Sequence, residues 1–191
     1  MELSPLDALR PRSRPPRGRT RFRLHERHWC RRANRWGGRS RVRAFFALVS
    51  RLGDGGFWYA LMAAMALFGG SHGLAGALHM AATSLVSLAL YRGLKRWTRR
   101  PRPFASDLRI RAWVAPLDEF SFPSGHTLHA VAFSVVALAY YPALWILLLP
   151  FTALVAASRV VLGLHYPSDV IAAIALGLAL GGGSLWLAGI F

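Results

Sequence analysis

Two long stretches of this chain carry almost no charge, and they decide what it can fold into. Residues 55–91 contain no Asp, Glu, Lys or Arg, and residues 120–191 contain only Arg159 and Asp169. A run of about 20 apolar residues suffices for a helix to cross a bilayer, where backbone groups must be satisfied within the protein. The sequence therefore predicts a membrane protein and argues against a soluble globular enzyme.

Turn signals divide these stretches into segments of helix length. Glycines at 69, 70 and 73 interrupt the first stretch, and Tyr141-Pro142 interrupts the second. The segments are rich in Ala and Gly, which let helices pack closely in lipid. We expect an all-α, polytopic membrane helix bundle of about five transmembrane helices. These spans are predicted near residues 55–70, 73–93, 124–140, 143–161 and 168–189.

The net charge of +16 is segregated along the chain. Fifteen of the 24 Lys and Arg residues lie in residues 1–52 and eight in residues 92–111. With five spans, both regions and the loop near 160–168 share one membrane face. The Arg-rich N-terminal tail has no regularly spaced aromatic residues and no folded module. Contact with anionic lipid headgroups is therefore favoured over nucleic-acid binding.

The N-terminal region divides into two parts. Residues 1–40 are rich in Arg and Pro and poor in apolar residues, so we expect a largely disordered tail. In residues 42–52, apolar side chains recur at helical spacing. This segment is too short to span a bilayer and predicts an amphipathic helix in the interface, with a soluble docking helix as the alternative. Residues 41–191 would then form the membrane-embedded domain.

Three polar motifs lie at span ends on the predicted charged face. Charged residues at such positions mark functional sites, because they are costly in apolar surroundings. Their Lys and Arg side chains suit phosphate oxygens, the ammonium as a point charge and the guanidinium as a fork. The motifs are Lys95 with Arg102-Pro103, then Pro123-Ser124-Gly125-His126, then Ser158-Arg159 with His165 and Asp169.

The spacing within these motifs suggests nucleophilic chemistry. His165 and Asp169 are four residues apart, so the carboxylate can hold one imidazole nitrogen and leave the other as a nucleophile. His126 stands at a predicted helix start and can protonate a leaving oxygen. Ser124 and Gly125 would offer free backbone N–H groups to an anion there. Nothing in this set requires a metal ion.

Together the motifs resemble those of the type-2 phosphatidic acid phosphatase superfamily, in its membrane lipid phosphatase branch. All three are complete and in order over residues 95–169. The resemblance implies a metal-independent phosphatase without cofactors that forms a phosphohistidine on His165, oriented by Asp169. His126 would act as general acid and then as base. The residues expected to hold the phosphoryl oxygens are Lys95, Arg102, Ser124, Gly125 and Arg159.

Several functions fit this resemblance. The leading one is hydrolysis of a lipid phosphomonoester or diphosphate. Undecaprenyl or another polyprenyl diphosphate is preferred as substrate, because the loop over residues 104–122 is short for larger headgroups. Phosphatidylglycerol phosphate, phosphatidate and lipid A phosphates are alternatives. A lipid phosphotransferase on the same scaffold and a non-catalytic membrane protein with an anion site are the other candidates.

The resemblance also implies a location. It points to a bacterial inner membrane with the active site on the periplasmic side. The excess of arginine on the active face favours the cytoplasmic side instead, by the positive-inside rule.

Overall fold

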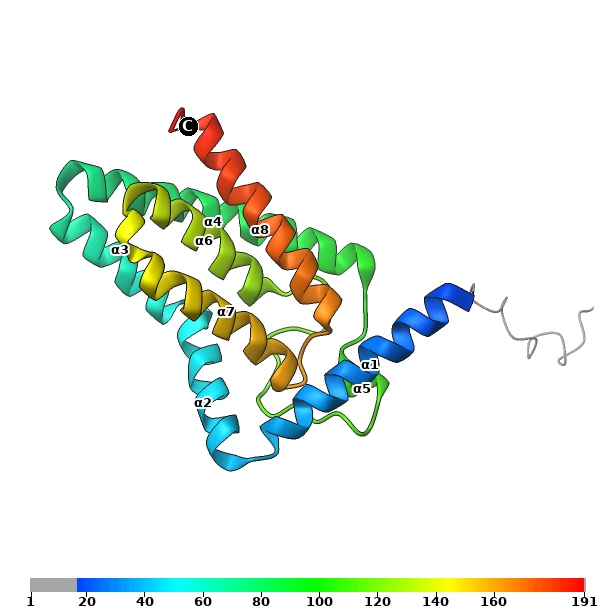
Figure 1. Ribbon diagram of the computed structural model, residues 1–191. Helices are drawn as coiled ribbons and strands as arrows, with labels where there is room; N and C mark the ends of the chain where they lie inside the picture. The colour runs from blue at the N-terminus through cyan, green and yellow to red at the C-terminus, as the bar shows by residue number, and fades with distance from the viewer. Residues whose placement is uncertain (1–16, 191) are drawn as a thin grey trace, which may run out of the picture.

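Helices make up all the regular secondary structure of this protein in the described part of the chain, residues 17–190 of a computed structural model (Figure 1). The predicted all-α membrane fold is therefore confirmed. The elements are α1 (Arg17–Gly37), α2 (Ser40–Arg51), η2 (Leu52–Gly56), α3 (Phe57–Phe68), α4 (Gly70–Thr98), α5 (Pro103–Ser106), α6 (Gly125–Tyr140), η3 (Pro142–Leu144), α7 (Trp145–Val161) and α8 (Pro167–Leu187).

Each of the five predicted spans corresponds to a helix, namely α3, α4, α6, α7 and α8. Three segments are long and apolar enough to cross a membrane by length and composition: Gly70–Ser106, Pro142–Val161 and Pro167–Leu187. The other two helices are shorter, with 16 residues in α6 and 12 in α3. The predicted interfacial helix over residues 42–52 corresponds to α2.

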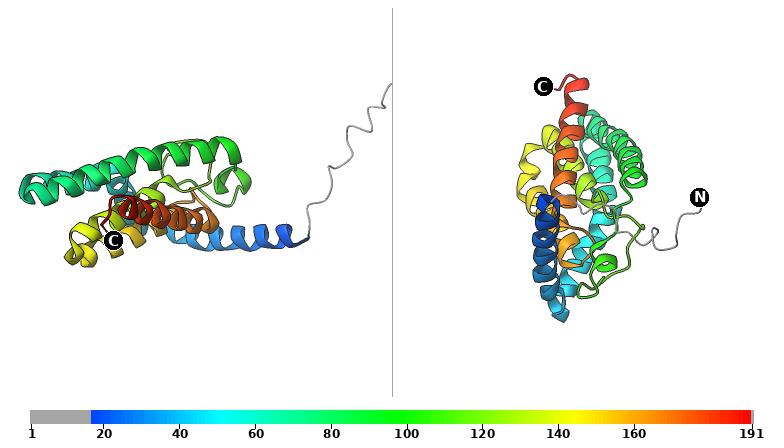
Figure 2. Two further views of the ribbon diagram at one scale, coloured as in Figure 1. Left: turned by 90° about the horizontal axis from the view of Figure 1, so that it is seen from above. Right: turned by 90° about the vertical axis from the view of Figure 1, so that its right-hand side faces the viewer.

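The bundle is built around α6, which packs against α4, α7 and α8, while α3 packs against α4 (Figures 1 and 2). Two glycines in α8 let it approach α6 closely. A Cβ atom on Gly177 would lie 2.8 Å from Val131, and one on Gly181 would lie 2.8 Å from Val135. Small residues spaced by four are a common way for membrane helices to pack backbone to backbone.

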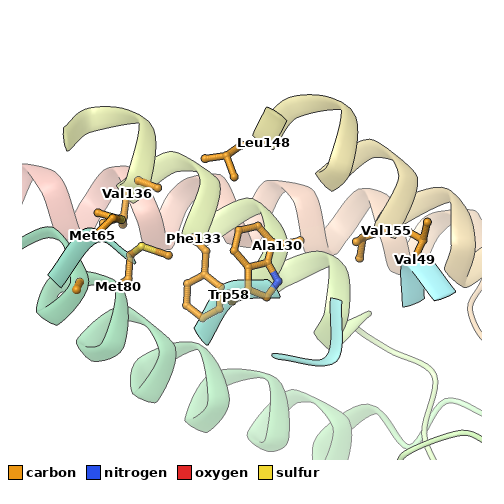
Figure 3. Close-up of a cluster of buried hydrophobic side chains, with 11 residues drawn as sticks. Val49, Trp58, Met65, Met80, Ala130, Phe133, Val136, Leu148 and Val155 are labelled. Carbon is orange, nitrogen blue, oxygen red and sulfur yellow. The ribbon is translucent and has the colours of Figure 1, made fainter. Parts of the chain in front are cut away.

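Buried apolar side chains from α2, α3, α4, α6 and α7 form the core, with Trp58 and Phe133 as its largest members (Figure 3). Trp58 is 1% exposed, and its ring lies 5.3 Å from that of Phe133 and 5.6 Å from that of Phe151, between centroids. Such offset and edge contacts add to the dispersion energy of packing. This core holds the first span against the centre of the bundle.

The N-terminal region differs from the expected disordered tail. Residues 1–16 of that tail lie outside the described residues, but from Arg17 onward the chain forms α1, which packs against α7 and α8. The side chains of Glu26, Cys30 and Asn34, spaced by four, are buried on one face. Asn34 Nδ2 donates to the carbonyl oxygens of Arg111 and Val161. The prediction was wrong here because α1 docks through hydrogen bonds, which apolar content does not register.

The two ends of the bundle have different contents. The turn between α3 and α4, the connection between α6 and α7 and the end of α8 lie toward the upper left of Figure 1. At the opposite end lie α1, α2, α5 and the loop between α7 and α8. The basic segments therefore gather at one end, as the number of spans predicts.

Candidate active site

The three sequence motifs meet at the end of the bundle where α1, α2 and α5 lie. A cavity of about 530 Å³ opens there between η2, α4, α6 and the loop over residues 107–124. Six of the eight expected site residues line this cavity, and Asp169 and Ser124 do not. The six are Lys95, Arg102, Gly125, His126, Arg159 and His165.

His165 follows a turn in which Gly163 has a φ of +76°, a conformation that L side chains rarely adopt. The imidazole is buried, and its Nδ1 lies 2.7 Å from the carbonyl oxygen of Ser121. A carbonyl only accepts, so Nδ1 donates its proton, and Nε2 carries the lone pair with Arg102 Nη1 at 3.4 Å. Burial, reinforced by the charges of Arg159 and Arg102, lowers the pKa of His165 to about 3. The imidazole is therefore neutral and available as a nucleophile.

Asp169 does not hold His165 as the four-residue spacing predicts. Its Oδ2 lies 3.7 Å from His165 Nδ1, beyond hydrogen-bond distance, because the carbonyl of Ser121 takes that position. Oδ2 instead accepts the backbone N–H of Tyr166 at 2.8 Å and the hydroxyl of Ser121. The carboxylate thus fixes the two backbone segments on either side of the imidazole. No motif in the sequence marks Ser121.

A buried ion-pair network lies behind Asp169. Arg100 Nη1 donates to Asp169 Oδ1 and to the hydroxyl of Ser168, each at 2.7 Å. Arg100 Nη2 donates to Glu26 Oε2 at 2.6 Å, and Glu26 also accepts the backbone N–H of Ser168 at 3.1 Å. We call Glu26, Arg100, Ser168 and Asp169 the rear cluster. Through it, α1 is tied to the first turn of α8, directly after His165.

The scarcity of acidic residues could have revealed these partners. The chain has eight Asp and Glu against 24 Lys and Arg. Within residues 17–190, every acidic side chain except Glu119 forms an ion pair or contacts a His. On sequence alone, Arg100 is indistinguishable from its neighbouring arginines, and Glu26 lies in the expected tail. In a chain with so few acids, an Asp or Glu therefore indicates an ion pair better than any single arginine does.

His126 stands in the first turn of α6, and its Nε2 contacts the carboxylate of Asp54. Asp54 lies in η2, where the chain kinks between α2 and α3 at Gly55, whose φ is +143°. The carboxylate can hold the imidazole in position, so His126 is placed to transfer a proton. Asp54 lies outside the three motifs, and only its charge at a span end marks it in the sequence.

Lys95 and Arg102 face the cavity, and both contact Asp118 in the loop over residues 107–124. Asp118 Oδ1 accepts from Lys95 Nζ at 2.7 Å and from Arg102 Nη2 at 2.8 Å. Burial would raise the pKa of Asp118, but the hydrogen bonds and charges of Lys95 and Arg102 outweigh it, and the pKa lies below its usual value. We call these three residues the front cluster. Sequence reasoning missed Asp118.

Arg159 also points into the cavity from the last turn of α7. Its guanidinium is 2% exposed, and Nη1 donates to the hydroxyl of Ser50. Its Nε has no hydrogen-bond partner among the described residues. Arg159 also faces a second cavity, of about 400 Å³, on the side of α2. The guanidinium therefore keeps donor capacity for a ligand.

Ser124 and Gly125 occupy different environments at the start of α6. The hydroxyl of Ser124 pairs with that of Thr127 at 3.0 Å, and its backbone N–H donates to the carbonyl oxygen of Asp169 at 3.3 Å. The hydroxyl and the backbone N–H of Ser124 therefore both have partners within the protein. Gly125 lines the cavity, and a Cβ atom there would lie 3.6 Å from the ring of Tyr91.

The assembled groups suit an anionic, tetrahedral ligand. A neutral histidine, three cations and a second histidine beside a carboxylate surround one cavity. In residues 17–190, no three His, Cys, Asp or Glu side chains gather closely enough to hold a metal ion. The arrangement provides a nucleophile, charge stabilisation and a proton donor from the protein's own side chains.

Two solved structures share this fold. A transmembrane PAP2-type phosphatidylglycerolphosphate phosphatase from Bacillus subtilis has 24% identity and a TM-score of 0.74, over 88% of this chain and 86% of that one. LpxE from Aquifex aeolicus has 24% identity and a TM-score of 0.72, over 82% of this chain and 92% of that one. No curated protein sequence matches the chain significantly.

The family model of the PAP2 superfamily matches residues 76–189. This range is more than half of the chain and contains all eight expected site residues. The helical membrane bundle agrees with the two similar structures. The protein therefore belongs to the PAP2 superfamily, as the motifs predict.

Proposed function

We propose that this protein hydrolyses a lipid phosphate through a phosphohistidine formed on His165, without a metal ion. The observation that carries the proposal is the position of His165. Its Nδ1 is held by a backbone carbonyl, and its ring lines a cavity that also contains Lys95, Arg102 and Arg159. A neutral nucleophile surrounded by fixed cations is the arrangement that phosphoryl transfer requires.

The reaction then has two balanced steps. In the first, Nε2 of His165 attacks phosphorus, the bond to the lipid oxygen breaks, and His126 gives that oxygen a proton. In the second, His126 takes a proton from water, the water oxygen attacks phosphorus, and the P–N bond breaks. Lys95, Arg102 and Arg159 stabilise the charge on the phosphoryl oxygens in both steps.

The cavity also supports a lipid as the rest of the substrate. Beyond the cations it is lined by Trp58, Leu88 and Phe133, which contribute apolar surface between α3, α4 and α6. The loop over residues 107–124 is short and contacts Lys95 through Asp118 and Phe120, at the side of the cavity where a headgroup would lie. We therefore favour a polyprenyl diphosphate, such as undecaprenyl diphosphate, over phosphatidylglycerol phosphate, phosphatidate and lipid A phosphates.

Phosphate release by the detergent-purified protein tests this function. The assay contains a chelator and compares the four lipid classes. We expect the fastest release from the polyprenyl diphosphate and a loss of about 10⁴-fold or more in His165→Ala, because the covalent route is gone. Dependence on added Mg²⁺ would contradict the metal-free mechanism. A requirement for an acceptor lipid would indicate a phosphotransferase, and full activity of His165→Ala a role in anion binding alone.

We propose further that the active face is external to the cytoplasm. Some arginines at this end form ion pairs within the protein, including Arg31 with Asp107. Because these arginines stabilise the fold, their number is a weaker argument for the cytoplasmic side. A cysteine at exposed Arg39, between α1 and α2, provides the test, because the only natural cysteine, Cys30, is buried. Labelling of Arg39→Cys in intact cells by an impermeant thiol reagent is expected. Labelling only after lysis would place the active face in the cytoplasm.

We also propose that α1 makes the contact with anionic lipid headgroups that the sequence predicts for the N-terminal tail. Phe22, Trp29 and Trp36 are each about 60% exposed, and their spacing by seven places them on one stripe of the helix. Arginines flank this stripe, which suits an interface with anionic headgroups. In nanodiscs, Trp29→Phe with Trp36→Phe should reduce the quenching of tryptophan fluorescence by brominated lipids, to which the other five tryptophans still contribute. Unchanged quenching would show that α1 stands away from the bilayer.

A further inference from the structure

The front cluster contains a carboxylate in the place where a phosphate oxygen would bind. Asp118 Oδ1 bridges Lys95 Nζ and Arg102 Nη2 at 2.7 and 2.8 Å, the distances expected for charge-assisted hydrogen bonds to phosphate as well. Arg102 Nη1 lies 3.4 Å from Nε2 of His165. The carboxylate oxygen is thus bound to the guanidinium that lies beside the nucleophile.

The remaining donors of both cations are largely committed to the backbone. Arg102 Nε donates to the carbonyl oxygen of Asp118 at 3.0 Å, and its Nη1 donates to that of Leu164 at 2.8 Å. Lys95 Nζ also donates to the carbonyl oxygen of Phe120 at 2.9 Å. These bonds hold the two cations in place whether or not the carboxylate is present. The donors that point to Asp118 Oδ1 are therefore the ones that a ligand would take over.

Burial explains why the empty site needs a counter-ion. The side chains of Lys95 and Arg102 are 7% and 2% exposed, and buried charges without a partner are strongly unfavourable. The side chain of Asp118 is 38% exposed and lies in a loop without regular secondary structure, so it can turn toward water. The two cations are therefore held firmly in place, whereas the carboxylate that pairs with them can be replaced.

We propose that Asp118 is the resident counter-ion of the phosphate site, displaced by the phosphoryl group of the substrate and returning as inorganic phosphate leaves. This inference rests on the proposed function, because it requires Lys95 and Arg102 to bind phosphate. Asp118 thereby sets the affinity for phosphate and limits inhibition by the product. A ligand must carry enough negative charge to compete with a carboxylate that both cations already hold.

Binding of inorganic phosphate to the purified full-length protein tests the proposal without relying on turnover. Equilibrium dialysis with radioactive phosphate is compared among the wild type, Asp118→Asn and Asp118→Ala. We expect both variants to bind phosphate about tenfold more tightly, since a charge-assisted competitor is gone. The inhibition constant of phosphate in the hydrolysis assay should fall by the same factor. Glu119→Gln, the same charge change at the neighbouring exposed residue, should stay within about twofold of the wild type.

Other outcomes separate this inference from the proposed function. If Asp118→Asn and Asp118→Ala bind phosphate as weakly as Lys95→Ala, Asp118 orders the cations and is not displaced. Unchanged affinity in both Asp118 variants would also overturn the proposal. If Lys95→Ala and Arg102→Ala bind phosphate like the wild type, the phosphate site itself has been misplaced. The unfolding temperature and the elution volume of each variant show that it has remained folded.

Discussion

The front and rear clusters use the same chemistry on two sides of His165, yet they differ in exposure. In the front cluster, Asp118 pairs with two cations while 38% of its side chain remains exposed. In the rear cluster, Arg100 pairs with two carboxylates whose side chains are 0% and 4% exposed. A half-exposed partner can be exchanged for a ligand, whereas a fully buried one can only be removed at a high energetic cost.

The backbone that carries the carboxylates is also less regular in the front cluster than in the rear cluster. Asp118 lies in an irregular loop, but Glu26 and Asp169 lie on α1 and α8, which pack against each other. The rear cluster therefore positions the loop of His165, and the front cluster receives the substrate. Four experiments test this distinction, beginning with the one of largest expected effect.

Removal of the shared cation should be the most damaging change to the rear cluster. Arg100→Ala leaves Glu26 and Asp169 as buried carboxylates without a counter-charge, which costs about 3–5 kcal/mol of stability. We expect a clear fall in unfolding temperature and at least about 100-fold loss of phosphate release, because the loop of His165 loses its support. The exposed Arg96→Ala is the matched control. Equal behaviour of the two variants would refute a special role for the rear cluster.

Asp54 tests whether exposure alone makes a carboxylate replaceable. Its side chain is 37% exposed, close to the value for Asp118, but it lies in η2, at the kink between α2 and α3, and contacts His126. We expect Asp54→Asn to lower the turnover of a lipid phosphate about 10- to 100-fold, because His126 loses the carboxylate that orients its ring for proton transfer. An aryl phosphate needs little help from an acid and should be nearly unaffected. Equal losses on both substrates would assign Asp54 a purely structural role.

Glu26 tests how far α1 contributes to the site. Glu26→Gln keeps the size and one acceptor but leaves Arg100 with a single carboxylate partner. We expect a loss of about 1–3 kcal/mol of stability and a decrease in activity smaller than that of Arg100→Ala. Thermal unfolding in detergent measures the first quantity, and phosphate release the second.

Cys30 should respond least, although it lies next to the rear cluster. Burial, together with the negative charges of Glu26 and Asp169, raises the pKa of its thiol to about 12. The thiol therefore stays protonated at neutral pH, and a maleimide at pH 8 should leave the folded protein unmodified. Because the folded pKa is raised, this contribution to stability is present below about pH 9 and is lost as the pH rises toward 12. Rapid modification of folded protein by the maleimide would show that α1 detaches from the bundle.

The fold and the motif residues could be predicted because they rest on local patterns. An uncharged run of about 20 residues leaves few choices other than a membrane helix. His126, His165 and Arg159 stand at the ends of such runs, where a polar side chain is costly and therefore indicates a functional site. Both patterns depend only on neighbours along the chain, so the amino-acid sequence alone displays them.

The pairing of the supporting residues could not be predicted, because the two members of each pair are distant in the sequence. Glu26 meets Ser168 across 142 positions, and Arg159 meets Ser50 across 109. The spacing of His165 and Asp169 even suggested a direct hydrogen bond, which the carbonyl of Ser121 replaces. A backbone acceptor has no sequence signature, so no motif could have revealed it.

The sequence by itself determined a helical membrane bundle, the family and the cations and histidines that gather at one end. The tertiary structure alone decided which acid serves which base. It placed Glu26 and Asp169 on Arg100, Asp54 on His126, and Asp118 on Lys95 and Arg102. The physical reason is that hydropathy acts on every residue separately, whereas compensation of a buried charge depends on the one partner that the folded chain brings within about 3 Å.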